Sequence, residues 1–429
     1  LSVDYSGQEV SVSWPSLMLA HVRSLSIFGY SEQMPPISEF KALRVLDLES
    51  SVKLQNSDLN NVVDLFQLRY LRIAASRITH LPEQIGELQF LETLDLRRTW
   101  IRKLPASIVK LRRLSCFSAN GARLPDGVGK MQSLQELSGI TVYDDCSTNS
   151  LLELVNLNSL RSLKLTWYIR ESRKDRTHYT DSLASSLGKL VSSSLESLSI
   201  INGPFSGYIP FDSWSWSSSP HLLQELYIPK CCFQRIPDWM ASMNNLYRLC
   251  IRSKQVTKQI LQILGDLPAL LDLELRSESD DPMEILIISK CIFRCLKIFR
   301  LYGSFVGLIF EDGSMQKVRE ISVVVRAHKA KSAFADHPDL GIRNLTSLMD
   351  LNVWINCEGA RVQEVTVLEA AIADATALLP NHPTPHFFRE NEENMVKDDL
   401  PNHPAPHFFR ENEEKMVKDE AHMQEKMLE

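Results

Sequence analysis

Residues 81–114 read LPEQIGELQFLETLDLRRTWIRKLPASIVKLRRL, and this stretch matches itself when it is shifted by 23 residues. The aligned pairs are Leu81 with Leu104, Pro82 with Pro105, Ile85 with Ile108, Leu88 with Leu111 and Leu91 with Leu114. A unit this short cannot bury its own apolar face, whereas stacked copies cover one another. The repeated apolar residues therefore predict a core, and the variable residues between them predict a surface.

The pattern L-x-x-L-x-L, with apolar residues at offsets 0, 3 and 5, recurs along most of the chain. Fourteen copies begin at Val22, Leu43, Leu68, Leu91, Leu114, Leu134, Leu160, Leu195, Leu223, Leu246, Leu270, Leu296, Val318 and Leu348, and a clipped copy stands at Leu1. Alternation of the last two apolar positions predicts a short strand in each unit. Prolines between the units argue against one long helix.

The spacing of these units, mostly 20 to 30 residues, is in the range of leucine-rich repeats. We therefore predict an α/β fold, a right-handed leucine-rich-repeat solenoid of about 14–15 repeats over residues 1–357. A parallel sheet should form its concave face, with short helices, 3-10 turns and loops on the convex face. Insertions are expected near 166–194 and 201–222. Aromatic residues in the second insertion could pack on the array or contact a partner: Phe205, Tyr208, Phe211, Trp214 and Trp216.

The C-terminal region departs from the repeat pattern. Residues 361–379 space their apolar residues like a helix, and we expect residues 358–379 to form a C-terminal cap. LPNHPTPHFFRENEENMVKDD (379–399) is followed by LPNHPAPHFFRENEEKMVKDE (400–420), identical at 18 of 21 positions. Proline density and acidic runs predict that residues 380–429 form a disordered tail outside the packed body.

The composition excludes several classes of function. The net charge is −6, and residues 380–429 hold the whole acidic excess, so bulk attraction to nucleic acid is not expected. The sequence contains no stretch of 18 apolar residues, so no membrane span is predicted. The eight cysteines contain no CxxC pair, which favours buried thiols in a reducing compartment.

Motifs of known chemistry are missing from the sequence. It contains no GxxxxGK[ST], GxGxxG or GxSxG, so no catalytic or cofactor-binding residue is predicted. Histidines at 382, 386, 403 and 407 have a metal-ligand spacing only on a helix, which the neighbouring prolines forbid, so no metal site is predicted. The expected functional feature is therefore a surface for binding another protein.

Outward positions on the later strands are the candidates for partner binding, because Tyr, Trp and Arg are frequent anchors of interfaces. These candidates are Tyr227, Arg248, Arg252, Asp272, Glu274, Arg276, Arg300, Tyr302 and Trp354. A mixed polar face exposed only to solvent is the alternative for any one of them.

A basic zone at residues 69–113 contains ten Lys and Arg residues, opposed within that window by four acidic residues. Its central members are expected to merge into one positive patch that faces an acidic surface. This basic patch consists of Arg72, Arg97, Arg98, Arg102 and Lys103. A merely solvated face is the alternative here too.

Several segments resemble the repeat domain of plant intracellular nucleotide-binding leucine-rich-repeat disease-resistance proteins, of the coiled-coil class common in cereals. The resemblance rests on HVRSLSIFGY, FKALRVLDLE, LFQLRYLRI, the stretch quoted first and GVGKMQSLQELSGITV, and it extends over roughly residues 15–380. It implies a sensor that recognises a pathogen effector, or a host protein modified by one, and holds a nucleotide switch off until then.

By this resemblance, the early basic repeats would rest on the receptor's own nucleotide-binding module, and the later repeats would contact the ligand. The phosphate-binding loop is missing here, so ADP or ATP is expected only on a module outside this chain, in a cytoplasmic or nucleo-cytoplasmic protein. The alternative is a cytosolic leucine-rich-repeat scaffold or ubiquitin-ligase adaptor with no immune role. An upstream F-box would favour the adaptor, and an upstream phosphate-binding loop would exclude it.

Overall fold

The computed structural model describes most of the chain in two compact units. The described residues are 1–4, 19–28, 36–49, 54–75, 77–203, 206–210, 216, 220–279, 285–303, 305, 307–328 and 339–396. Among them, unit 1 contains Leu1–Leu195 and Ile200–Gly207, and unit 2 contains Glu196–Ser199 and the residues from Tyr208 onward. Strand β9 (Ser197–Asn202) crosses this boundary along the chain.

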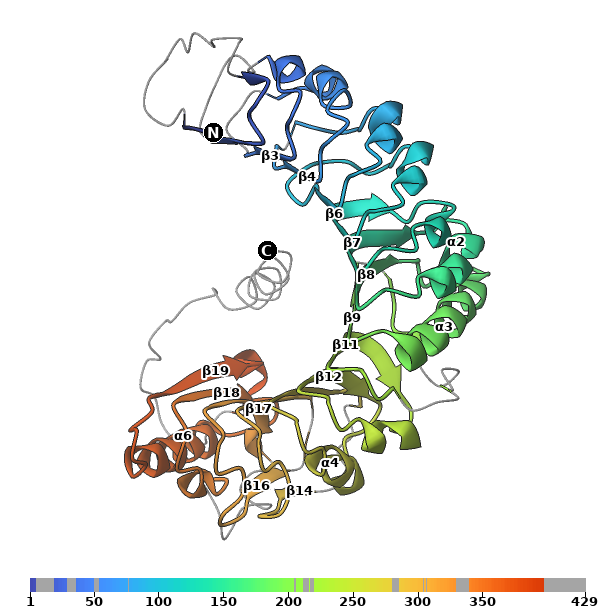
Figure 1. Ribbon diagram of the computed structural model, residues 1–429. Coiled ribbons are helices and arrows are strands. Elements are labelled where there is room, and N and C mark those ends of the chain that lie inside the picture. The colour runs from blue at the N-terminus through green and yellow to red at the C-terminus, as the bar shows by residue number, and fades with distance from the viewer. Residues whose placement is uncertain are drawn as a thin grey trace. The chain divides into compact units, whose positions relative to one another are not determined.

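Unit 1 is built on short strands that pair in parallel, each with the next along the chain from β1 to β8 (Figure 1). These strands are β1 (Ser2–Asp4), β2 (Ser24–Phe28), β3 (Val45–Leu48), β4 (Tyr70–Ile73), β5 (Thr93–Asp95), β6 (Cys116–Arg123), β7 (Glu136–Tyr143) and β8 (Ser162–Tyr168). All share one side of the unit, which we call the strand face of unit 1.

The chain returns between these strands on the opposite side of unit 1, through helices that are mostly single 3-10 turns (Figure 1). They are η1 (Ile37–Glu39), η2 (Asn56–Asn61), η3 (Glu83–Glu87), η4 (Ala106–Lys110), η5 (Val128–Lys130), α2 (Thr148–Glu153), η6 (Leu154–Asn156) and α3 (Arg176–Ser193). Pro82 and Pro105 stand directly before η3 and η4 with φ of −65°. The proline ring fixes φ near this value. Proline has no backbone N–H, but the first N–H groups of a helix have no partner within the helix, so this loss costs nothing there. The prolines therefore favour the start of a turn at these positions.

Unit 2 repeats the design with longer strands. Its main parallel ladder runs through β11 (Glu225–Phe233), β12 (Arg248–Ser253), β13 (Asp272–Ser277), β15 (Ile298–Tyr302), β17 (Glu320–Arg326), β18 (Asp350–Asn356) and β19 (Pro385–Glu390). Strand β10 (Ile209–Pro210) pairs with the end of β11, and β14 (Ile285–Ile288) pairs with β16 (Gly307–Phe310) in a separate two-stranded sheet. The return helices are η7 (Asp238–Ser242), α4 (Lys258–Gly265), η8 (Ile342–Asn344), α6 (Val362–Ala377) and η9 (Glu392–Asn394).

The predicted repeat pattern coincides with the observed core. Each of the fourteen L-x-x-L-x-L copies includes residues of one strand, from β2 to β9 and then in β11, β12, β13, β15, β17 and β18. The central leucines of these patterns, among them Leu71, Leu94, Leu163, Leu226 and Leu273, are 0% exposed. The leucine-rich-repeat solenoid predicted from the sequence is therefore confirmed.

The two predicted insertions take different forms. Residues 176–193 of the first form the α3 helix, which buries Leu183, Leu187 and Leu190. In the second, Trp216 is buried and stacks on Trp239 with ring centroids 4.3 Å apart, whereas Tyr208 is exposed. Three of the aromatic candidates lie outside the described residues: Phe205, Phe211 and Trp214.

The prediction that everything after residue 379 lies outside the packed body is wrong for residues 385–390. These residues form β19, which pairs along its length with β18, from Leu351–Pro385 to Asn356–Glu390. Helix α6 lies within the range predicted to be helical, but it connects β18 to β19, so the last described strand follows it. Proline is tolerated as the first residue of a strand, which explains how a proline-rich segment can add to the sheet. Residues 397–429 lie outside the described part of the chain.

Candidate protein-binding surface

The register of unit 2 gathers the predicted partner-binding residues into rows on one side of its sheet, the strand face of unit 2. One row aligns Glu225, Arg248, Asp272, Ile298, Glu320 and Asp350, and the next outward row aligns Tyr227, Cys250, Glu274, Arg300, Ser322 and Asn352. A third row contains Arg252, Arg276 and Tyr302. Residues that are more than 20 positions apart in sequence thus become neighbours because outward positions repeat once per strand.

Charges on this face are paired across the strands. Asp272 of β13 forms an ion pair with Arg248 at 3.4 Å and another with Arg300 at 3.1 Å. Arg300 also reaches Glu320 of β17, at 2.7 Å. The strand face of unit 2 therefore holds a chain of alternating charges, Arg248–Asp272–Arg300–Glu320, rather than free cations.

Glu274 and Arg276 form a second pair on β13, with the arginine Nε 2.7 Å from the carboxylate. Glu274 is only 6% exposed, although an outward position was predicted to face solvent. Its carboxylate pairs with Arg276 and also forms a side-chain hydrogen bond with Cys250, the aligned residue of β12. A buried carboxylate of this kind requires such a partner.

Aromatic rings continue the third row toward the end of unit 2. Arg276 lies over the ring of Tyr302 at 4.9 Å, and the Tyr302 ring meets Trp354 edge to face at 5.7 Å. Trp354 then stacks on Phe388 of β19 at 4.9 Å. The prediction from sequence included Tyr302 and Trp354 but missed Phe388, because the segment that carries it was assigned to the tail. The alternation of apolar and polar residues in PHFFRE was too short a signal to separate a strand from a loop.

Burial sets the ionisation of this face. It raises the pKa of Tyr302 to about 12, and it raises the pKa of Tyr227 well above the usual value for a phenol. Burial also raises the pKa of the Asp272 carboxyl, against the opposing effect of Arg300 and Arg248. The phenols are therefore neutral at physiological pH and can donate hydrogen bonds to a partner.

Arg252 lies apart from this network. Its Nε donates to the backbone oxygen of Pro229 at 3.2 Å, and its guanidinium lies 4.9 Å from the ring of exposed Tyr208. Arg248 similarly covers the ring of Tyr227 at 5.7 Å. The predicted residues therefore form two groups, one from Tyr227 through Arg248 and Asp272 to Arg300 and one from Glu274 through Arg276 and Tyr302 to Trp354, with Arg252 and Tyr208 as a pair beside them.

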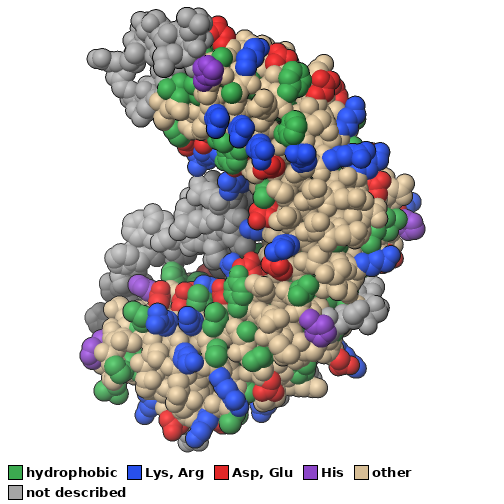
Figure 2. Space-filling view, viewed as in Figure 1, with side chains coloured by type: hydrophobic (Ala, Val, Ile, Leu, Met, Phe, Trp, Pro, Cys, Tyr) green, Lys and Arg blue, Asp and Glu red, His purple; other side chains and the backbone are tan. Residues whose placement is uncertain are grey.

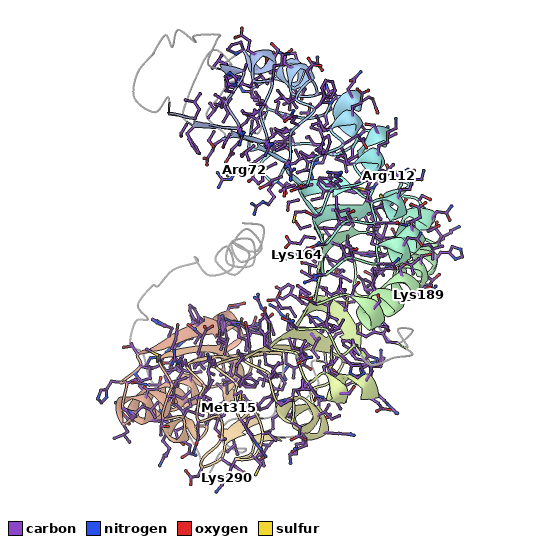
Figure 3. The ribbon with its side chains drawn as sticks, in the orientation of Figure 1. Arg72, Arg112, Lys164, Lys189, Lys290 and Met315 are labelled. Atoms are coloured by element: carbon purple, nitrogen blue, oxygen red, sulfur yellow. The ribbon has the colours of Figure 1, made fainter. Side chains whose placement is uncertain are left out.

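The basic patch of unit 1 is less positive than its sequence window indicates. Arg72 points to the strand face of unit 1 (Figure 3) and reaches Asp47 at 3.2 Å, Glu49 at 3.8 Å and Asp95 at 3.9 Å. Arg98 also reaches Glu49, at 3.8 Å, and Arg97 reaches Asp95 at 2.8 Å. The window 69–113 missed Asp47 and Glu49 because they belong to the preceding repeat. These three arginines therefore lie among more carboxylates than the four acidic residues counted in the window, and their net positive charge is smaller than the sequence indicates.

The other two members of the patch lie differently. Arg102 donates to the backbone oxygens of Asn120 and Gly121, both at 3.4 Å, and its guanidinium is 6.0 Å from the ring of Trp100. Lys103 is exposed to solvent. Shared carboxylates thus bring Arg72, Arg97 and Arg98 together, and they do not include Arg102 or Lys103.

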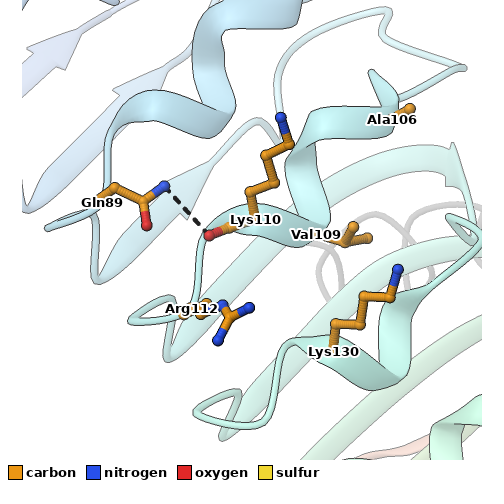
Figure 4. A pocket seen from close by; sticks show the side chains of 6 residues that line it. All are labelled: Gln89, Ala106, Val109, Lys110, Arg112 and Lys130. Atoms are coloured by element: carbon orange, nitrogen blue, oxygen red, sulfur yellow. Dashed lines mark hydrogen bonds between the residues drawn. The ribbon is translucent and has the colours of Figure 1, made fainter.

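A separate group of cations lies on the helix side of unit 1. An open hollow of about 610 Å³ is lined by Gln89, Ala106, Val109, Lys110, Arg112 and Lys130 (Figure 4). Gln89 bridges the hollow by donating to the backbone oxygen of Lys110 at 3.4 Å. Figure 2 shows a row of Lys and Arg side chains across this unit, with few acidic side chains between them. Part of the positive charge predicted for the early repeats is therefore on the side opposite Arg72.

Within the described ranges, no group of three metal-ligating side chains occurs, and no helix is long and apolar enough to cross a membrane. What these residues offer is two ordered strand faces, each with its charges held in place. A stacked parallel array with short return helices defines the leucine-rich-repeat class of protein.

The chain belongs to this class: the model of the family described as "Leucine-rich repeat region" matches residues 21–385. It is 33% identical over 371 residues to Disease resistance protein RGA5 of Oryza sativa subsp. japonica, which covers 83% of this chain and 32% of the relative. It is also 31% identical to Disease resistance protein Pik-2 of the same rice, over 64% of this chain and 30% of that protein. The family resemblance stated from the sequence is therefore confirmed, and the chain spans about a third of the length of these relatives.

A solved structure supports the fold alone. A leucine-rich-repeat protein of Leptospira interrogans superposes with a TM-score of 0.53 at 18% identity, covering 89% of this chain and 97% of that one.

Proposed function

We propose that this chain is the ligand-sensing repeat region of a plant innate immune receptor. Its similarity to rice disease resistance proteins, over 83% of its length in the case of RGA5, is the observation that carries the proposal. Its ligand is a pathogen effector or a host protein that an effector has modified. The receptor acts in the cytoplasm, and its ADP or ATP binds a nucleotide-binding module and not this chain.

The ligand binds the strand face of unit 2. Arg276 and Arg300 are already held by Glu274 and Glu320, so little side-chain freedom is lost when a partner arrives. Tyr302 presents a phenol that stays neutral and can donate a hydrogen bond, and tyrosine is a frequent anchor of interfaces. Since the charges on this face alternate in sign, shape and hydrogen bonding select the ligand more than net charge does.

Replacing Tyr302 by alanine in the full-length receptor tests this surface. Co-expression with the matching effector in leaf tissue should no longer cause cell death, while the receptor without effector stays inactive. Met349→Ala is the matched control, because Met349 is an exposed large side chain, 61% accessible, next to β18 in the same unit. With equal protein levels on an immunoblot, a normal response from Tyr302→Ala would show that the ligand binds elsewhere.

The basic patch of unit 1 (Arg72, Arg97, Arg98, Arg102 and Lys103) restrains the receptor by resting on an acidic surface of its own nucleotide-binding module. Each exposed ion pair is worth only about 0–1 kcal/mol, so several together form a contact weak enough to release. Arg97 and Arg98 suit this role, because their side chains are 41% and 52% exposed despite their partners in the chain.

Charge reversal at two positions tests the restraint. Arg97→Glu with Arg98→Glu should cause cell death without any effector. Lys110→Glu with Arg112→Glu reverses the same number of charges on the helix side of the unit and should leave the receptor quiet (Figures 3 and 4). If only the second pair activates the receptor, the restraining surface lies on the helix side and the assignment made here is wrong.

A further inference from the structure

The hollow on the helix side of unit 1 gathers exposed cations from two neighbouring repeats. Lys110 ends η4, Arg112 follows it in the chain, and Lys130 ends η5 in the next repeat (Figure 4). No carboxylate is among the described residues that line the hollow. None of the three cations forms an ion pair with another described residue, in contrast to Arg72 on the strand face of the same unit.

Carboxylates do occur on the turn beside the hollow. Glu83 and Glu87 belong to η3, which packs next to η4, and both are exposed. Neither lines the hollow, and neither pairs with its cations. The positive charge of the hollow is therefore available to a partner, but it is limited to a short stretch of surface.

An apolar rim adjoins these cations. Phe90 follows Gln89, which lines the hollow, and its side chain is 43% exposed. Arg113, next to Arg112, lies over the Phe90 ring at 4.7 Å. Phe66, which is 57% exposed, occupies the position of Gln89 one repeat earlier. Exposed aromatic side chains beside cations suit a protein partner, whereas a free phosphate would use the cations alone.

We propose that this hollow is a docking site for an acidic segment of another protein, one that carries an apolar side chain among its carboxylates. The carboxylates bind Lys110, Arg112 and Lys130, and the planar guanidinium of Arg112 can hold one of them with two parallel hydrogen bonds. The apolar side chain packs on Phe90. This inference does not rest on the proposed immune function, because every contact that carries it lies in unit 1.

A nucleic acid, the other common polyanion, fits this surface less well. Its backbone carries a negative charge at every nucleotide and needs a continuous track of cations. Here Glu83 and Glu87 on the adjacent turn would repel a long run of phosphates, whereas a short acidic segment can bind between them and η5.

Binding of a labelled peptide to the full chain tests the site. The probe is a short peptide of Glu and Asp with two central leucines, followed by fluorescence anisotropy at physiological ionic strength, where fields beyond about 8 Å are screened. Lys110→Glu with Arg112→Glu should weaken binding at least about 10-fold, because two attractions become repulsions. Lys174→Glu with Lys189→Glu reverses as many exposed charges in the same unit outside the hollow, and it should bind like the parent.

Phe90→Ser tests the apolar part of the site. Replacing the leucines of the probe by serine should weaken its binding to the parent chain but not to Phe90→Ser, whose packing surface is already lost. Equal losses in the two double variants would mean attraction by net charge alone. Displacement of the probe by inorganic phosphate or a short oligonucleotide, as readily as by unlabelled peptide, would mean a general anion site. Either result, or the lack of saturable binding, would overturn the proposal.

Discussion

Leu94 occupies the centre of the most regular repeat and is 0% exposed in β5. Replacing it by alanine should lower the free energy of unfolding by about 2–5 kcal/mol, because the side chain leaves a cavity between packed repeats. Glu92→Ala, which removes an exposed pair with Arg69 at 3.0 Å, should cost no more than about 1 kcal/mol. Chemical denaturation followed by circular dichroism compares the two, and equal midpoints would contradict burial of Leu94.

Gly139 shows a different residue-level constraint. It has a φ of +67°, and a Cβ built on it would lie 1.7 Å from the backbone oxygen of Ala119 in the neighbouring strand. Gly359 has a similar φ of +70° but open space around it. Gly359→Ala should cost about 1–2 kcal/mol from backbone strain alone, and Gly139→Ala should cost clearly more. Thermal melts of the two variants separate backbone strain from steric clash. An equal loss of stability in both would show that β6 and β7 can move apart without a loss of stability.

Most buried residues could be predicted from the sequence, because the apolar residues that mark buried positions recur at a regular spacing. The charge partners could not. Arg72 contacts Asp47, which is 25 residues away, and the choice of partner depends on which repeat lies beside it and in which register. The burial of Glu274 was equally hidden, since Glu274 occupies an outward position in the alternation of its own strand.

At the level of elements, the strands that carry the leucine pattern were predictable and the others were not. Strands β10, β14 and β16 are short and lack the pattern, and β19 begins with a proline in a segment that is acidic overall. The length of the α3 helix was also missed, because the window 166–194 shows only a wider spacing between leucines. A helix or strand can be predicted from local sequence only where the residues of that element carry a pattern typical of it.

The attachment of β19 gives an element-scale prediction. Arg389 of β19 binds both carboxylate oxygens of Glu369 in α6, at 2.7 Å each. Glu369→Gln removes the charge and should speed hydrogen exchange in residues 385–390 several-fold. Glu392→Gln, which removes a single contact at 3.3 Å, should have a smaller effect. If both variants exchange like the parent, backbone pairing with β18 alone holds the strand.

At the scale of the whole molecule, a repeat array transmits a defect only to its neighbours, since each repeat contacts the ones beside it. Leu94→Ala should therefore increase hydrogen exchange in β4, β5 and β6 of unit 1 and leave β13 and β15 of unit 2 unchanged. Exchange followed by mass spectrometry measures all of these segments at once. A uniform increase across both units would mean that the chain unfolds as one cooperative body.

The alternating charges on the strand face of unit 2 also have a consequence for inheritance. Arg300 pairs with two carboxylates, Asp272 and Glu320, so the loss of Arg300 takes an ion pair from each of them. Under the proposed function, a lineage that replaces Arg300 to bind a new ligand must also change a neighbouring strand, or pass through a less stable intermediate. Tyr302 is not a member of an ion pair, so it can be replaced without a second substitution. If the proposed ligand-binding role holds, sequence differences between related receptors should therefore occur singly along the aromatic row and as coupled pairs along the charged one.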